Sequence, residues 1–215
     1  DGVVADLLAD DADAADEVDD VAAGDRIGPW QIISKLGAGG MGSVWLAERA
    51  DGVYVQKVAL KTIKPGMDST RVLAQFRRER ALLARLKHPD IASLIDGGVD
   101  QRGRPWFAMD HVQGLGLRAW IDRQPALEAR LRLFEKLCRA VAHAHQQLVI
   151  HRDIKPGNVL VQADDEPKLL DFGIAKLLAD DDVEQTLTVQ RFASRSYAAP
   201  EQLRGEAVTT ATDVY

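Results

Sequence analysis

The segment that decides the fold is HRDIKPGN at residues 151–158, followed by DFG at residues 171–173. The first segment places Asp153 and Asn158 five residues apart, and the second adds Asp171 thirteen residues further on. Carboxylate and amide oxygens are hard ligands of the kind that Mg²⁺ takes beside phosphate groups. The two segments therefore indicate chemistry on a phosphate that is bound together with a divalent cation.

A glycine-rich segment, GAGGMGSV at residues 37–44, lies upstream and fits the pattern G-x-G-x-x-G-x-V. Glycines let a backbone turn approach phosphate oxygens closely and direct its N–H groups at them. By itself the segment is equally typical of a plain glycine hairpin. It joins one predicted strand to another, which argues against the strand-to-helix turn that binds dinucleotides.

A lysine, Lys61, lies inside the apolar strand predicted for residues 55–63. An ammonium group in an apolar strand costs free energy unless it finds a partner. The candidate partner is Glu79, which shares the apolar face of a helix predicted over residues 70–87. A purely structural salt bridge is the alternative interpretation, although buried ion pairs more often mark function.

Around these motifs the sequence predicts a small antiparallel sheet with one helix, followed by a mainly helical part. Hairpin turns are expected at Asp51-Gly52 and at residues 100–104, and His88-Pro89 should end the helix. Strands are expected at residues 30–33, 44–47, 55–63, 91–95 and 105–109. A boundary between two lobes is expected near residues 113–116.

Beyond that boundary, the 4, 3 spacing of apolar residues predicts a long helix over residues 127–148. We expect its apolar stripe to be buried, and we expect faces of this helix to be exposed if the lobe is incomplete. The stripe comprises Leu127, Leu131, Phe134, Cys138, Val141, His145 and Leu148. His145 and Cys138 are interpreted as core residues, and His143 with His145 is not interpreted as a metal pair.

The composition is that of a globular protein: 46% of the 215 residues are hydrophobic and 28% are charged. The single cysteine excludes a disulfide scaffold and fits a reducing compartment. No apolar run approaches the ~20 residues that span a bilayer, and the acidic N-terminus lacks the basic flank of a secretory signal.

The negative charge is concentrated at the N-terminus. Residues 1–25 contain nine Asp, one Glu and no Lys or Arg, so the rest of the chain carries +4 of the overall −6. This Ala- and Asp-rich segment is predicted to be a disordered tail, with an acidic docking arm as the alternative. The remaining charge is too small to indicate nucleic-acid binding.

With Ala199-Pro200-Glu201 as a fifth motif, the sequence over residues 30–215 resembles the eukaryotic-type protein kinase catalytic domain, most closely that of bacterial Ser/Thr kinases. The resemblance implies an α+β, bilobal fold: an antiparallel β-sheet with one helix in the N-lobe and a mainly helical, here incomplete, C-lobe. The expected division is a tail at residues 1–25, the N-lobe at 26–112 and part of the C-lobe at 113–215. Asp213 is expected to begin a helix that supports the catalytic loop.

The resemblance also assigns roles in phosphate transfer. It implies that Asp153 accepts the proton of the substrate hydroxyl and that Lys155 contacts the γ-phosphate of ATP. Lys61 would hold the α- and β-phosphates, positioned by Glu79. The implied Mg²⁺ ligands are Asn158 and Asp171.

The nucleotide site implied by the resemblance has three parts. The loop over the phosphates comprises Leu36, Gly37, Ala38, Gly39, Gly40, Met41, Gly42, Ser43 and Val44. The adenine ring would lie between Val44, Ala59 and Leu160. Met109 would guard the back of the pocket, and the backbone at Asp110 and Val112 would bond the adenine edge.

Regulation is implied by Arg152, because an arginine before the catalytic aspartate meets a phosphate on the activation segment in this family. Thr186 and Thr188 are the expected autophosphorylation sites. Solvent-facing loop threonines are the alternative. Ser194 stands where the family usually has threonine, which keeps the hydroxyl.

The expected function is that of a protein Ser/Thr kinase in bacterial signalling, with ATP and Mg²⁺ as cofactors and a protein carrying a Ser/Thr acceptor as substrate. The alternatives are a non-catalytic ATP-binding or scaffold module, an inactive kinase fragment, and a small-molecule phosphotransferase, which residues 194–201 argue against. Self-association for autophosphorylation is expected, and nucleic acid is not an expected partner. The expected location is the cytoplasm, or the cytoplasmic face of a membrane if an anchor follows.

Overall fold

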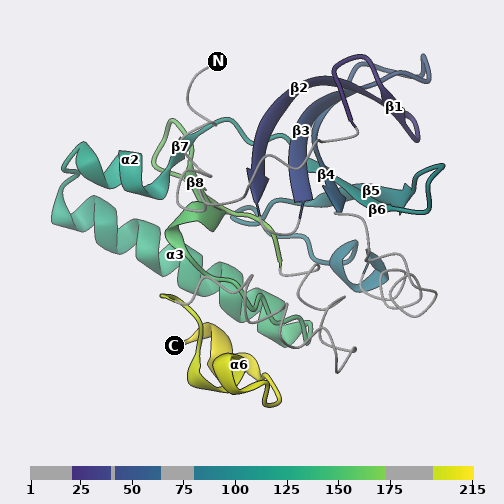
Figure 1. The fold of residues 1–215 in the computed structure, drawn as a ribbon. Helices are drawn as coiled ribbons and strands as arrows, with labels where there is room; N and C mark the ends of the chain where they lie inside the picture. Colours follow the sequence, from purple (N-terminus) through teal and green to yellow (C-terminus); the bar gives the residue numbers. More distant parts are fainter. Residues whose placement is uncertain (1–20, 40–41, 64–79, 173–195) are drawn as a thin grey trace.

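The computed structural model describes residues 21–39, 42–63, 80–172 and 196–215. A curled six-stranded sheet forms one part of the molecule, and a long helix with a small second sheet forms the other (Figure 1). This arrangement confirms the α+β, bilobal fold that the sequence predicts.

The large sheet is antiparallel, with the strand order β1-β2-β3-β4-β6-β5. Its strands are β1 (Arg26–Ile27), β2 (Trp30–Gly39), β3 (Gly42–Arg49), β4 (Lys57–Ile63), β5 (Leu94–Val99) and β6 (Pro105–Asp110). Because β6 pairs with both β4 and β5, it is an interior strand, and five of its six residues are buried.

The alternation along β4 decides which residues face the core. Val58 and Leu60 are fully buried in the core of the sheet, where they cluster with Trp30 and Trp106. Successive side chains of a strand point to opposite faces, so Ala59 and Lys61 lie on the other side of the sheet. The predicted assignment of these faces is confirmed by the burial pattern of the strand.

The glycine-rich segment continues the strands on both sides instead of separating them. β2 runs to Gly39, six residues beyond the predicted end, and Gly39 pairs with Gly42 at the start of β3. Gly42 has φ +146°, and a Cβ there would lie 1.9 Å from the carbonyl oxygen of Thr62. Only glycine fits this close approach of two backbones.

The strand predicted at residues 91–95 is wrong, because β5 spans Leu94–Val99 instead. Ile91 forms a single bridge to Leu169 in the second sheet and is buried in the other core cluster. The ladder of β5 with β6 begins only at Leu94, which pairs with Met109. The apolar residues at positions 91–95 therefore belong to a segment that runs from the second sheet to the large sheet.

The helix predicted over residues 70–87 is described only in its last turn, because residues 64–79 lie outside the described ranges. Residues 80–83 are helical, so the helix ends four residues before the predicted end. The next two turns close with N–H groups of Arg85 and Leu86 bonded three residues back, which is tighter than α-helical geometry.

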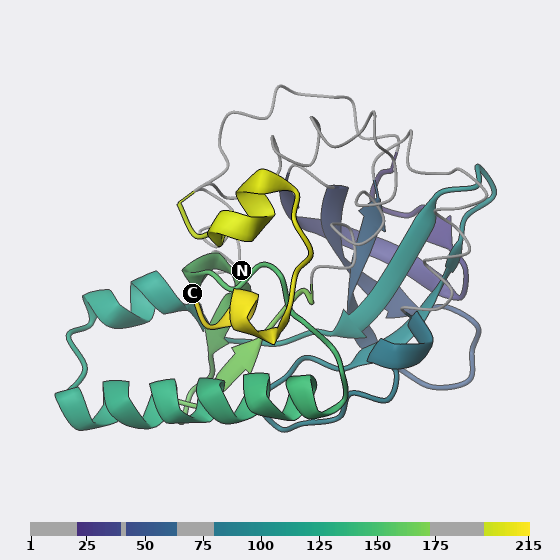
Figure 2. The same cartoon turned by 90° about the horizontal axis from the view of Figure 1, so that it is seen from below.

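The second part contains α2 (Leu117–Asp122), α3 (Leu127–Gln146) and a three-stranded sheet of β7 (Leu115–Gly116), β8 (Val159–Val161) and β9 (Pro167–Leu169). A 3-10 turn, η2 (Pro156–Asn158), leads into β8. The C-terminal elements are α6 (Pro200–Arg204) and the 3-10 helix η3 (Thr210–Asp213). This C-terminal segment lies beside α3 in both views (Figures 1 and 2).

The long helix forms where the sequence predicts it, but only part of its apolar stripe is buried: Val141 packs against the core, whereas most of the other members form an exposed apolar face, as was also expected. Leu127, Leu131 and Phe134 are 70%, 58% and 65% exposed. Cys138 and Leu148 are also exposed. The buried face of α3 uses Leu133, Ala140 and Ala144 instead, because small side chains allow the helix to lie close to β8 and β9.

The predicted tail boundary is also corrected. Val21 is buried in the core of the large sheet, and Ala22 donates its N–H to the carboxylate of Asp25. Gly24 and Asp25 exchange backbone hydrogen bonds with Ile32. Residues 21–25 therefore belong to the folded body, and the rest of the predicted tail, residues 1–20, lies outside the described residues.

Candidate active site

A pocket lies between the large sheet and the β8–β9 hairpin. It encloses about 630 Å³ of empty space, part of it open to solvent. Nine of the predicted site residues line it: Leu36, Val44, Ala59, Met109, Asp110, Val112, Asn158, Leu160 and Asp171. Residues from distant parts of the sequence thus meet around one cavity.

The walls of the pocket are set by strand register. Ala59 on β4 pairs with Met109 on β6, which places a small side chain next to the methionine. Val44 on β3 pairs with Lys61, and Leu160 comes from β8 in the second sheet. The result is a mainly apolar slot between the two parts of the molecule, of the kind that binds small molecules.

Asp110 lines this slot, and its carboxylate is hydrogen-bonded to the backbone of a neighbouring segment. Its Oδ2 accepts a hydrogen bond from the N–H of Ser93 at 2.9 Å, and its own N–H donates to the carbonyl of Ser93. These bonds fix residues 110–112 at the mouth of the pocket.

The glycine-rich hairpin is only partly described. Leu36 and Val44, on either side of the hairpin, line the pocket, whereas Gly37, Ala38, Gly39, Gly42 and Ser43 do not. Gly40 and Met41 lie outside the described residues.

Lys61 forms an ion pair with Asp171, which lines the pocket. Its Nζ is 2.6 Å from Oδ2 of Asp171, and the side chains are 18% and 27% exposed. The predicted partner Glu79 lies outside the described residues, so the Lys61–Glu79 pair stays a prediction. Asp171 itself has φ +51°, a left-handed conformation that is uncommon for a non-glycine residue.

Two of the predicted catalytic residues, Asp153 and Lys155, gather with the predicted metal ligand Asn158 in the turn before β8. The amide nitrogen of Asn158 donates to the carbonyl oxygen of Asp153 at 2.7 Å and to its carboxylate at 3.0 Å. The Nζ of Lys155 lies 3.6 Å from the same carboxylate. Because Nδ2 of Asn158 faces Asp153, its Oδ1 is the atom that could serve a cation.

The donor set fits Mg²⁺. Asn158 and Asp171 line the same pocket, and the N–H of Leu170 bonds the carbonyl of Asn158, which ties their backbones together. No group of three His, Cys, Asp or Glu side chains able to hold a metal occurs in the described ranges. Two protein ligands suffice for Mg²⁺, because it takes its other ligands from water and substrate phosphates.

His151 is the first residue of the turn that carries Asp153, Lys155 and Asn158 (residues 151–158, the candidate catalytic turn). It is buried, only 1% exposed. Its Nε2 lies 2.8 Å from the carbonyl of Leu170, its Nδ1 accepts the N–H of Asp153, and its ring packs on Phe172. This pattern requires a neutral ring with the proton on Nε2. Burial lowers the pKa of His151 below its usual 6.5, with Asp213 and other carboxylates opposing the shift.

Replacing His151 by phenylalanine should flatten the pH dependence of stability. Below pH 6.5 the unfolded chain binds a proton that folded His151 excludes, so the free energy of unfolding falls by about 1.4 kcal/mol per pH unit as the pH decreases. Burial also lowers the pKa of His88 and of His111, so some slope of the same sign will persist in the variant. Urea unfolding at pH 5.5, 6.5 and 7.5 measures the slope, and equal slopes for both proteins would contradict a neutral His151.

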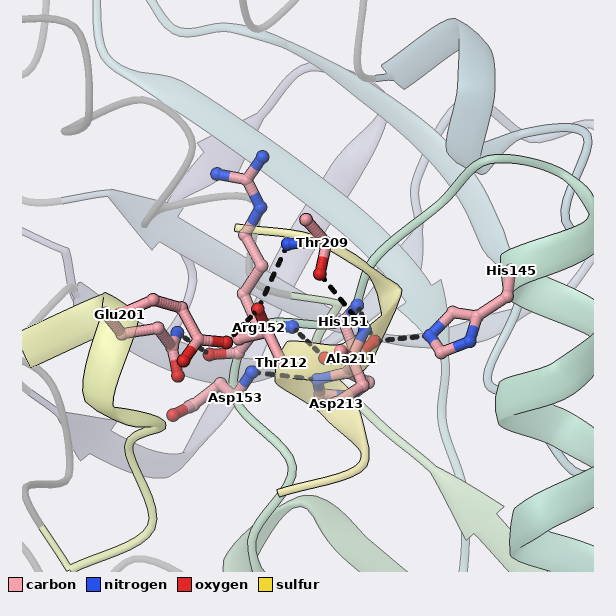
Figure 3. Close-up of polar contacts among 10 residues, drawn as sticks. His145, His151, Arg152, Asp153, Glu201, Thr209, Ala211, Thr212 and Asp213 are labelled. Atoms are coloured by element: carbon pink, nitrogen blue, oxygen red, sulfur yellow. Dashed lines mark hydrogen bonds and ion pairs between the residues drawn. The ribbon is translucent and has the colours of Figure 1, made fainter. Parts of the chain in front are cut away.

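The catalytic turn is anchored from below by Asp213, whose side chain is 1% exposed (Figure 3). Its Oδ2 accepts the N–H of His151 at 2.7 Å and faces Nε2 of His145 at 2.8 Å, while its Oδ1 accepts the N–H of Arg152 at 2.8 Å. Asp213 is the last residue of η3 and contacts the turn through its own carboxylate, so the helix that it was expected to begin stays a prediction. His145 is 17% exposed and is satisfied by this bond.

Glu201, in the fifth motif, accepts the hydroxyl of Thr212 at 2.6 Å. This hydrogen bond lowers the pKa of the Glu201 carboxyl. The contact joins α6 to η3, so the motif holds together the C-terminal segment that carries Asp213.

Several site residues were missed from the sequence. His111, Gly157 and Leu170 line the pocket, and each lies next to or within a predicted motif, which is the signal that could have found them. Gln202, which bonds the backbone of Arg152, was also missed, although it directly follows the fifth motif. Among the expectations for residues 173–195, the predicted phosphorylation sites Thr186 and Thr188 and the substrate-side Ser194 lie outside the described residues.

Three features together define a bilobal protein-kinase-like fold. They are the apolar slot beside the glycine hairpin, the Lys61–Asp171 pair and the turn that carries Asp153 and Asn158. Residues 30–215 match the family described as "Protein kinase domain". The chain belongs to the protein kinase domain family.

The chain is similar to bacterial serine/threonine-protein kinases. It is 36% identical over 196 residues to PrkC of Bacillus subtilis and 37% identical over 195 residues to PknD of Mycobacterium tuberculosis, covering 89% of this chain in each case. A crystal structure of the M. tuberculosis PknI kinase domain superposes with a TM-score of 0.69 at 30% identity, covering 91% of this chain and 71% of that one.

The chain spans only 30% of the length of PrkC and 29% of PknD. In the part of this chain that the structure describes, no helix combines the length and apolar character needed to cross a bilayer.

Proposed function

We propose that this chain carries the catalytic machinery of a protein Ser/Thr kinase, which transfers the γ-phosphate of ATP to serine and threonine hydroxyls. The observation that supports this most strongly is that two polar pairs each place one member at the same pocket: Asp171, which pairs with Lys61, and Asn158, which bonds Asp153. The first can neutralise phosphate charge, and the second can hold an acceptor hydroxyl beside it.

In this proposal the slot between Val44, Ala59 and Leu160 holds the adenine ring, with Met109 behind it. The backbone at residues 110 and 112 bonds the adenine edge. The glycine-rich loop, residues 36–44, covers the phosphates, and Lys61 holds the α- and β-phosphates with Glu79 as its positioning partner.

At the acceptor end, the Asp153 carboxylate takes the proton of the attacking hydroxyl, and Lys155 contacts the γ-phosphate. The two groups lie 3.6 Å apart, so one acceptor oxygen beside the pair could be within hydrogen-bond reach of both the base and the positive charge. Asn158 and Asp171 would hold Mg²⁺, which supplies neutralisation of the charge on the phosphate oxygens.

We further propose that the N-lobe ends at residue 112 and that the C-lobe begins at residue 113. The same proposal includes protein substrates, self-association for phosphorylation at Thr186 and Thr188, and a cytoplasmic location. Arg152 would receive the phosphate on that segment.

The acceptor specificity separates this proposal from a small-molecule phosphotransferase and from a non-catalytic module. Three peptides identical except for Ser, Thr or Tyr at one position are incubated with the full-length protein, ATP and Mg²⁺, and phosphate is counted by mass spectrometry. We expect transfer to Ser and Thr but not to Tyr. Transfer only to Tyr, or to none of the peptides and to no protein substrate, would contradict the proposal.

A further inference from the structure

The residue that precedes the proposed base has an unusual backbone. Arg152 has φ +66°, in the left-handed region that side-chain-bearing residues adopt only at a cost in free energy. Such a conformation persists only where neighbouring groups hold it in place. The peptide that follows Arg152 carries Asp153, so whatever holds this backbone also sets the direction of the proposed base.

Two side chains from the C-terminal segment hold Arg152, one on each side. Its N–H donates to Oδ1 of Asp213 at 2.8 Å (Figure 3). Its carbonyl oxygen accepts a hydrogen bond from Nε2 of Gln202, also at 2.8 Å. The N–H of the following peptide, which belongs to Asp153, donates to Nδ1 of His151. The Arg152–Asp153 peptide is thus held at both its oxygen and its nitrogen.

The side-chain amide of Gln202 has a defined orientation. Its Oε1 accepts the N–H of Ala199 at 3.1 Å, and its Nε2 donates to the carbonyl of Arg152. Turning the amide over would place an oxygen against the carbonyl and an N–H₂ group against the N–H, so only one orientation satisfies both partners. Because Ala199 is fully buried, Gln202 bonds Arg152 from a fixed position.

We propose that Gln202 is a positioning residue for Asp153: its amide fixes the Arg152–Asp153 peptide and thereby the direction of the Asp153 carboxylate. The inference rests on the proposed function, because it needs Asp153 to act as the base. It adds a direct link from the start of α6 to the catalytic turn, separate from the anchor at Asp213. A base that points away from the acceptor hydroxyl loses rate although it still binds substrate, because proton transfer requires hydrogen-bond geometry.

Two substitutions test the hydrogen bond that Nε2 of Gln202 donates to the carbonyl of Arg152. Gln202→Glu keeps an oxygen for the N–H of Ala199 but places a second oxygen against the carbonyl of Arg152. Gln202→Met has a similar length and no charge, and it removes both bonds. Arg204→Gln is the matched control, because Arg204 lies in the same short helix with its side chain 68% exposed.

The experiment measures kcat, KM for ATP and the thermal midpoint of the full-length protein and its variants, with a Ser/Thr peptide as acceptor. For both Gln202 variants we expect kcat to fall about tenfold, the value of one lost hydrogen bond with its partner left unsatisfied. KM for ATP should stay within about twofold of the wild-type value, because the nucleotide slot is untouched. Arg204→Gln should match the wild type.

The decisive comparison places each Gln202 substitution in an Asp153→Asn background. If Gln202 acts through the base, the double variants should be no slower than Asp153→Asn alone, because residues that act as a unit are not additive. A further tenfold loss in that background would overturn the proposal, as would wild-type kcat in Gln202→Met or an equal loss in Arg204→Gln. Failure of the proposed function is a different result: no transfer by the wild type, or no effect of Asp153→Asn.

Discussion

Replacing Asp153 by asparagine should lower phosphate transfer by about 10²–10⁴-fold, the usual contribution of a general base. Asparagine has nearly the same shape and keeps an oxygen that can accept the amide of Asn158. It cannot take a proton, and it removes the negative charge beside Lys155. Binding of Mg·ATP should be close to that of the wild type, because Asp153 does not line the nucleotide pocket.

The measurement is single-turnover transfer to a Ser/Thr peptide, with nucleotide affinity determined separately by calorimetry. Asp164→Asn is the matched control, because this aspartate is exposed on the turn between β8 and β9 and should leave the rate unchanged. A loss smaller than tenfold in Asp153→Asn would mean that the turn orients substrate without taking its proton.

Replacing Asp171 by asparagine should reduce transfer at least as strongly, because phosphate transfer depends more on charge neutralisation than on proton removal. The carboxylate is both a proposed Mg²⁺ ligand and the partner of Lys61 at 2.6 Å. Its removal leaves the ammonium without this counter-charge and weakens the cation site. The concentration of Mg²⁺ needed for half-maximal rate should therefore rise.

Lys61→Met tests the other half of the pair. We expect a comparable loss of transfer, with the Mg²⁺ requirement less affected than in Asp171→Asn, because methionine removes a phosphate contact but no cation ligand. Magnesium titrations of both variants make the comparison. An unchanged Mg²⁺ requirement in Asp171→Asn would contradict the assignment of Asp171 as a ligand.

The parts of the fold that the sequence predicts well are those in which side-chain type and backbone position are coupled locally. The alternation of Val58, Ala59, Leu60 and Lys61 sets the two faces of β4, and the structure has the same faces. Most of the pocket residues were predicted from the resemblance to the protein kinase family, which rests on motifs of glycine, lysine and carboxylates at fixed spacing and needs no three-dimensional information.

The wrong predictions came from apolar patterns, because such a pattern does not show which element of the fold packs against it. The 4, 3 stripe of α3 predicts an amphipathic helix, yet Leu127 and Phe134 are exposed and the alanines Ala140 and Ala144 are buried. A helix with two apolar faces looks the same in sequence whichever one packs. Similarly, Ile91 is apolar because it bridges to Leu169, not because it belongs to a strand of the large sheet.

Gln202 shows a second limit, which is that long-range hydrogen bonds leave no local pattern. Fifty residues separate its amide from the carbonyl of Arg152, and neither the left-handed backbone of Arg152 nor its two anchors can be read from spacing. Polar residues that position a base through the main chain are found only when the fold brings them together.

The most direct test of the central claim is the intact mass of the full-length protein after incubation with Mg·ATP, beside Asp153→Asn and Lys61→Met. Each phosphate raises the mass by a fixed increment, so transfer is counted without any assumption about the physiological substrate. We expect added phosphate on the wild type alone, and we expect fragmentation to map it to serine or threonine. Equal phosphate on all three proteins, or none on the wild type, would contradict the claim that this pocket and turn form a kinase active site.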